Sequence, residues 1–152
     1  MASKKPTMAQ AQLQMQLYDL RREPRLRAAR KWFMQNFFLE KPEDAQQVAP
    51  PGSKQDAYVR MTISYWEMVC QMMEYGMLHE DLFFQTTNEQ YLVWERIKPA
   101  IAAIRLHVHN AHMFENLEKA AKRYEKWVER RAPGHLAVVR KWMEQGLKSG
   151  QK

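Results

Sequence analysis

Three histidines and a glutamate fall within residues 107–115, and these residue types are common ligands of transition metals. His109, His112 and Glu115 are spaced three residues apart, so on a helix they could share one face. His107 and His109 would instead point about 160° apart. Asn110 favours a break in the helix at this place, and no second pair of ligands accompanies the histidines. The sequence therefore favours solvated or capping histidines over a metal site, and we expect no bound metal or cofactor.

Cys70 is the only cysteine and would need a nearby base to act as a nucleophile. It falls on the apolar part of a predicted helix, with no cation close to it in sequence, so we expect a buried and unreactive thiol. The sequence also lacks a glycine-rich phosphate loop and a strand-to-helix nucleophile turn. These observations predict a protein that is not an enzyme.

Basic residues gather near both ends of the sequence and could bind phosphate groups. Residues 1–41 contain nine Lys and Arg against three Asp and Glu, and residues 100–152 contain eleven against five, whereas residues 42–99 are acidic. The clusters comprise Arg21, Arg22, Arg25, Arg27, Arg30 and Lys31 near the start and Lys122, Arg123, Lys126, Arg130 and Arg131 near the end. If both clusters share one face, the protein could bind nucleic acid or an anionic surface. The acidic middle favours instead that charges of opposite sign offset one another in the folded chain or across a homodimer.

The elements that position these residues are predicted to be helices. Glycine is rare, with five residues, and methionine is common, with eleven, a composition that favours helix over sheet. A length of 152 residues fits a single domain. No apolar stretch approaches the roughly 18 residues of a membrane span, and the first residues do not resemble a signal peptide. We therefore expect a cytoplasmic all-α protein.

Apolar periodicity predicts a bundle of six long helices and one short one. The long helices are expected at 7–23, 25–39, 57–75, 89–110, 113–131 and 135–146, and the short one at 79–84. In this single domain, residues 7–40 form an N-terminal helical pair, 41–54 a proline-rich loop, 56–147 the core helices and 148–152 a frayed tail. On the first helix, one apolar stripe comprises Ala9, Leu13, Leu17 and Leu20, and a second beside it comprises Met8, Ala11, Met15 and Tyr18.

Residues 57–75 are predicted to form the central helix. The polar residues Arg60, Ser64, Glu67, Gln71 and Glu74 follow a 4, 3, 4, 3 spacing and form one narrow strip. Most of the remaining positions are apolar, so neighbouring elements must cover this helix on several sides. The following Gly76 suits the left-handed conformation that ends many helices. The strip itself could face either solvent or another helix.

Several short motifs resemble an uncharacterised family of small bacterial all-helical domains of unknown function. The resemblance covers roughly residues 15–107 and is carried by "LYDLRREPRLRAARKWF", "YWEMVCQMMEYGMLHEDLF" and "YLVWERIKPAIAAIR". It implies a helical fold and no particular activity. Relatives often carry membrane segments before the domain, and this sequence departs from them in lacking such a segment.

These observations favour a non-enzymatic interaction or scaffold domain that forms a homo-oligomer or joins a larger assembly. Aromatic and methionine side chains suit such contacts because they offer a large and adaptable surface. The expected contact residues are Trp32, Tyr65, Trp66, Trp127 and Trp142. Binding of nucleic acid or an anionic surface through the basic ends is the alternative function.

Overall fold

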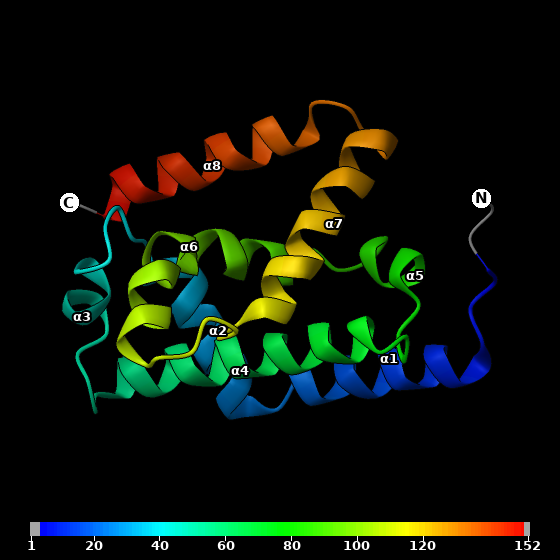
Figure 1. Ribbon diagram of the computed structural model, residues 1–152, viewed down its shortest axis with the longest axis horizontal. Coiled ribbons are helices and arrows are strands. Elements are labelled where there is room, and N and C mark those ends of the chain that lie inside the picture. Colours follow the sequence, from blue (N-terminus) through cyan, green and yellow to red (C-terminus); the bar gives the residue numbers. More distant parts are fainter. Residues whose placement is uncertain (1–3, 151–152) are drawn as a thin grey trace.

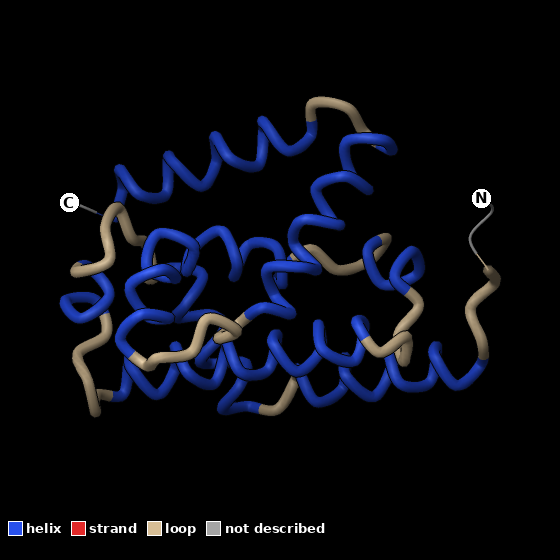
Figure 2. Tube along the Cα trace, in the orientation of Figure 1, coloured by secondary structure: helices blue, strands red, loops and turns tan. Residues whose placement is uncertain are grey.

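The computed structural model describes residues 4–150, which contain eight α-helices and no strand (Figures 1 and 2). The helices are α1 (Met8–Arg21), α2 (Pro24–Asn36), α3 (Asp44–Val48), α4 (Lys54–Glu74), α5 (Glu80–Phe84), α6 (Glu89–His107), α7 (Glu115–Arg131) and α8 (His135–Gly150). The all-α prediction is confirmed. Six helices are long and lie where periodicity placed them, and two are short, so the expected count is one short helix too few.

Two segments differ from the sequence prediction. The expected loop at 41–54 contains the five-residue helix α3, whose Asp44 side chain accepts hydrogen bonds from the backbone N–H groups of Glu40 and Lys41. One turn and a half is too short for an apolar period to show in the sequence. The C-terminal helix α8 continues to Gly150, so residues 148–150 are not the expected frayed tail. Residues 151 and 152 of that tail lie outside the described part of the chain.

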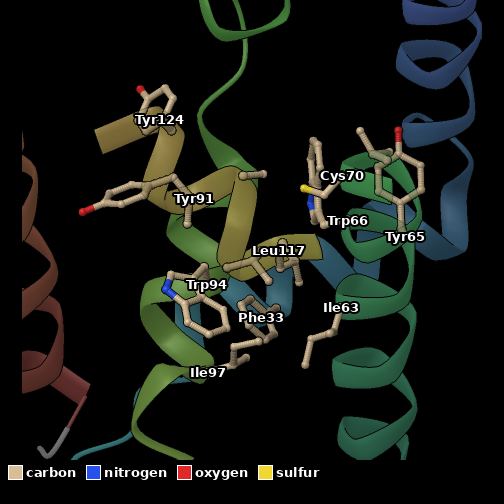
Figure 3. Packing of buried hydrophobic residues seen from close by; sticks show 14 of the residues in the cluster. Phe33, Ile63, Tyr65, Trp66, Cys70, Tyr91, Trp94, Ile97, Leu117 and Tyr124 are labelled. Carbon is tan, nitrogen blue, oxygen red and sulfur yellow. The ribbon is translucent and has the colours of Figure 1, made fainter. Parts of the chain in front are cut away.

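The helix α4 is central to the fold, as its apolar circumference predicted. It packs against α2, α6 and α7, and its buried side chains include Ile63, Trp66 and Cys70 (Figure 3). Gly76 follows it with a φ of 71°, and the N–H of Met77 donates to the carbonyl of Met72, which closes the helix end. The polar strip of α4 has a mixed role: some of its residues face solvent and others face α7.

The helix α1 lies beside α4, and most of its side chains are exposed (Figure 1). Thr7 caps its N-terminus, and Leu17 is its one buried residue. Leu20, which belongs to the same apolar stripe of the sequence as Leu17, is 57% exposed. The side of α1 that faces the fold carries glutamines: Gln10 donates to the carbonyl of Gly76, and Gln14 to the Thr86 hydroxyl. Polar contacts therefore help to decide which side of α1 is covered.

None of the eight helices within residues 4–150 is sufficiently long and apolar to cross a membrane.

Candidate interaction surfaces

A carboxylate between four helices holds the first half of the fold together. Glu89, at the start of α6, accepts two hydrogen bonds from Arg30 of α2 at 2.5 and 2.7 Å and one from the Trp66 indole of α4 at 3.1 Å. Arg30 also donates to the carbonyl of Arg21 at the end of α1. Both ionic side chains are only 16% exposed. This arrangement uses Arg30 to stabilise the fold and leaves it poorly placed to contact a ligand phosphate.

A second carboxylate caps α7. Glu67 of α4 accepts hydrogen bonds from the backbone N–H groups of Asn116 and Leu117 and from the Asn116 side chain. These N–H groups belong to the first turn of α7, where no acceptor is available within the helix. The residue before α7, Phe114, has a φ of 58° and makes no capping bond through its side chain. Glu67 therefore supplies the cap from outside the helix.

The acidic residues after Gly76 bind α7 rather than solvent ions. Arg123 forms ion pairs with Glu74 and Glu80, and the Trp127 indole donates to Asp81 at 2.8 Å. This bond, followed by a bond from the Gln85 side chain, lowers the pKa of Asp81 against the effect of burial. The contacts fix α5 on α7 and use side chains that the sequence assigned to a basic patch and to an interface.

Two of the expected interface residues are in the interior, so the prediction is wrong for them. Trp66 is 1% exposed, and Tyr65 is buried with its hydroxyl donating to the carbonyl of Leu17. Burial raises the pKa of Tyr65 to about 12. Trp32 and Trp127 are half-buried, and Trp142 is 63% exposed. Tyr65 and Trp66 were misplaced because α4 is covered on the side that carries them.

The two basic clusters lie on elements that flank α4. The first is on α1 and α2, the second on α7, and α4 packs against both α2 and α7 (Figure 1). Arg30 and Arg123 are taken up by the internal ion pairs described above, and Arg21 lies against the rings of Tyr18 and Trp66. The remaining residues of both clusters are exposed, namely Arg22, Arg25, Arg27, Lys31, Lys122, Lys126, Arg130 and Arg131.

The histidines near residue 110 and Cys70 were the candidates for a metal site and a nucleophile. The helix α6 ends at His107, and His109 has a φ of 52°, so the expected break near Asn110 is present. His112 contacts Glu115 at 3.3 Å, and His109 lies within the break between α6 and α7. Within the described residues, no group of three or more His, Cys, Asp or Glu side chains is placed to hold a metal ion. Cys70 is buried, and burial raises its thiol pKa well above the ordinary value.

The outward side of α1 carries exposed apolar side chains. Its residues Met8, Ala11, Met15 and Tyr18 form a stripe, called the α1 stripe below. Met8 is 75% exposed, Met15 is 68% and Tyr18 is 49%. Their 3, 4, 3 spacing is that of a helix–helix contact and was visible in the sequence. The signal was ambiguous because two apolar stripes occur on α1, and periodicity does not tell which one the fold covers.

Comparison with known proteins identifies a family but no activity. The model of a domain of unknown function, DUF4760, matches residues 6–127, from just before α1 into the last third of α7. No curated protein and no solved structure matches the chain. The match spans most of the sequence, extends beyond the 15–107 segment that carried the resemblance, and leaves α8 outside. The chain is therefore a member of the DUF4760 family of domains of unknown function.

Proposed function

We propose that this protein is a non-enzymatic interaction module that forms a homodimer through the α1 stripe. One observation carries the proposal: residues 6–18 contain no charged side chain, in a chain in which 27% of residues are charged. The outward side of this segment presents Met8, Met15 and Tyr18 to solvent. Depletion of charge together with exposed methionine and aromatic side chains is typical of the centre of a protein–protein interface.

A second copy of the chain suits the α1 stripe because the stripe is complementary to itself. Its residues are placed symmetrically about the level of Leu13. In an antiparallel pair, Met8 of one copy meets Tyr18 of the other, and Met15 meets the small Ala11. Each end then has a sulfur–aromatic contact, and a large side chain faces a small one in the middle. The helix is about 21 Å long, so the contact can extend over four turns.

Repulsion between the positively charged copies would make dimer formation depend on salt, and the direction of this dependence differs from that of nucleic-acid binding. Each chain has a net charge of +7, and Arg22 of one copy would lie near Lys4 of the other at both ends of an antiparallel pair. Added salt screens repulsion between exposed like charges. The proposed dimer is therefore tighter at high salt, whereas binding to nucleic acid weakens as salt rises.

The test is light scattering coupled to size exclusion at high micromolar concentration and two salt concentrations. We expect the unaltered protein to elute as a dimer that is more populated at high salt. Met15→Glu places a charge in the middle of the stripe, so we expect a monomer. Leu106→Glu is the matched control: Leu106 is 77% exposed on α6, away from α1, and its variant should remain dimeric. A monomeric unaltered protein under all conditions rejects the proposal.

A second candidate function, phosphate binding, is supported by the exposed cations around the α1–α2 turn. Arg22, Arg25, Arg27 and Lys31 are all exposed. Such a cluster could contact a nucleic-acid backbone or another anionic surface. The experiment is a mobility shift with single-stranded and duplex nucleic acid at increasing salt. Replacement of Arg27 and Lys31 by Gln would weaken binding, and an unchanged affinity at high salt would reject the phosphate mechanism. The cytoplasmic location expected from the sequence stays a prediction under either function.

A further inference from the structure

The C-terminal helix α8 forms one wall of a cleft whose other wall includes α6. Figure 1 shows α8 crossing above α6, and Gly146 of α8 comes close to the Phe38 ring, where an added Cβ would lie 2.9 Å from a ring carbon. On one side of this contact is a cleft of about 310 Å³, called the α8 cleft below. It is lined by Phe38, Asn88, Leu92, Arg96, His135, Val139, Trp142, Met143 and Gly146.

Arg96 is the only arginine or lysine that lines the α8 cleft. Its contacts are with backbone carbonyls and an aromatic ring, and it has no carboxylate partner among the described residues. Its Nη1 donates to the carbonyls of Phe33 and Met34 at the end of α2, and its guanidinium carbon lies 4.1 Å from the centre of the Phe38 ring. Its Nε is buried and has no hydrogen-bond partner in the described part of the chain, since both of these hydrogen bonds come from Nη1. Burial lowers the pKa of Arg96 to about 10, which still leaves it charged at neutral pH.

The other residues of the α8 cleft indicate what kind of ligand could bind to the guanidinium of Arg96. No Asp or Glu lines the cleft, and no ion pair to Arg96 is present within the described residues. A neighbouring cleft shares Phe38, Arg96 and Met143 with the α8 cleft. It differs in being lined also by Glu95 and Glu144, together with Arg140. Leu92, Val139 and Trp142 give the α8 cleft apolar walls. On the side of the α8 cleft, Arg96 is therefore a cation that makes no ion pair within the described residues and has apolar walls beside it. Such a site suits a ligand that is anionic at one end and apolar at the other.

We propose that the α8 cleft binds a small amphipathic carboxylate, with the carboxylate on the guanidinium of Arg96 and the hydrocarbon along Leu92, Val139 and Trp142. The family match ends at residue 127, so Arg96 and Leu92 belong to the matched domain, whereas Val139 and Trp142 lie beyond it. The proposed site therefore combines residues of the matched segment with residues of α8, which lies outside it. The cleft and the α1 stripe are on different elements, and the two proposals stand independently.

Calorimetric titration of the full chain with octanoate, octan-1-ol and acetate tests the ligand class. Octanoate has both the anionic and the apolar part, and each of the other probes lacks one. We expect octanoate to bind at one site per chain and each of the others to bind at least about tenfold more weakly. Octan-1-ol lacks the hydrogen bond between charged groups, which contributes about that factor or more, and acetate lacks the apolar chain, whose burial contributes about fourfold in affinity per CH₂. Equal binding of octanoate and octan-1-ol would overturn the role of Arg96. Equal binding of octanoate and acetate would overturn the role of the apolar walls.

Variants and an NMR probe test the location. On addition of octanoate, the indole signal of Trp142 should shift and that of the buried Trp66 should not. Trp142→Glu adds a negative charge at the exposed edge of the cleft, so we expect octanoate affinity to fall at least about tenfold. Val138→Glu is the matched control, because Val138 is exposed on the same helix but does not line the cleft. Unchanged affinity in Trp142→Glu, or an unshifted Trp142 signal, contradicts the proposal.

Removal of the cation is the complementary test. Arg96→Met keeps an unbranched apolar stem and removes the charge, and octanoate binding should then fall to the level of octan-1-ol. Lys98→Met, an exposed position on α6 outside the cleft, should bind octanoate as the unaltered protein does. Because Arg96 also binds the end of α2, the fold of Arg96→Met is checked by circular dichroism. If that variant does not fold, Trp142→Glu and Val138→Glu decide the question.

Discussion

Among single residues, Glu89 has the contacts on which the packing of α2, α4 and α6 most depends. Its carboxylate accepts from Arg30 and from the Trp66 indole, and the pair is largely removed from solvent. Glu89→Gln would leave the guanidinium of Arg30 without a countercharge. We expect a loss of about 3 kcal/mol in the free energy of unfolding, measured by urea denaturation, because breaking a buried pair leaves an uncompensated charge.

An exposed ion pair on the same helix gives the control for Glu89→Gln. Lys98 contacts Glu95 at 3.4 Å and is 55% exposed. Lys98→Ala should change the free energy of unfolding by less than about 0.5 kcal/mol, since solvent screens such pairs. Similar small losses in both variants would show that the Glu89 pair adds no more to stability than a surface contact.

Glu118 is expected to make stability depend on acid pH. Hydrogen bonds from Lys122 and then from Arg105 lower its pKa from the ordinary 4.5. A carboxyl whose pKa is lower in the folded state stabilises the fold fully above its unfolded pKa and loses this effect as pH falls through the folded value. Urea denaturation should therefore show a constant contribution above about pH 5 and a loss below pH 4.5. Glu118→Gln should lose less stability than the unaltered protein over that acid range, and identical pH profiles would contradict this assignment.

Contacts of this kind are not accessible to sequence reasoning. Arg30 and Glu89 are 59 residues apart, and neither stands out from the other charged residues around it. The sequence therefore grouped Arg30 with a phosphate-binding patch, although its partner is internal. Trp66 was misassigned for the same reason, because burial depends on which helices cover α4. Local patterns predict that a residue lies on a helix, and long-range packing decides what it contacts.

At the level of elements, the start of α7 depends on a residue of another helix. Glu67 accepts from two backbone N–H groups of the first turn of α7. Glu67→Ala removes this acceptor, and we expect a loss of about 1–3 kcal/mol in the free energy of unfolding. Hydrogen exchange should localise the change, with faster exchange at Asn116 and Leu117 than in the unaltered protein. Glu67→Gln retains an acceptor oxygen and should be intermediate; equal exchange in all three proteins would reject the cap.

The helices themselves were largely predictable, because apolar periodicity, caps and terminating glycines are local. Thr7 begins α1 and Gly76 ends α4 as the sequence indicated. The helix α3 was missed because five residues are too few to show a period. The stripe that contains Leu13 and Leu17 does face the fold, whereas Leu20 is exposed. The polar contacts of Gln10 and Gln14 could not be predicted, since they involve residues more than sixty positions away. The candidate surface on α1 follows from the orientation of this helix and could not be identified before it.

At the scale of the whole molecule, internal ion pairs use part of the positive charge that the sequence contains. Acidic side chains of α4, α5 and α6 pair with Arg30 of α2 and Arg123 of α7. The net charge of +7 nevertheless remains, with exposed basic residues on both α2 and α7. This distribution favours general repulsion between copies at low salt, which the uncharged α1 stripe must overcome for the proposed dimer to form.

The stability of the whole molecule should then depend on its concentration. If two copies pair through the α1 stripe, association favours the folded state by mass action, and Tm rises with protein concentration. Calorimetry at increasing concentration should show this rise for the unaltered protein and more strongly at high salt. Met15→Glu should have a Tm independent of concentration, and Leu106→Glu should follow the unaltered protein. A constant Tm for the unaltered protein would contradict association of the folded chains, because any pairing that is lost on unfolding raises Tm with concentration. If Tm still rises with concentration in Met15→Glu, the copies pair through another surface, and the α1 stripe is not the interface.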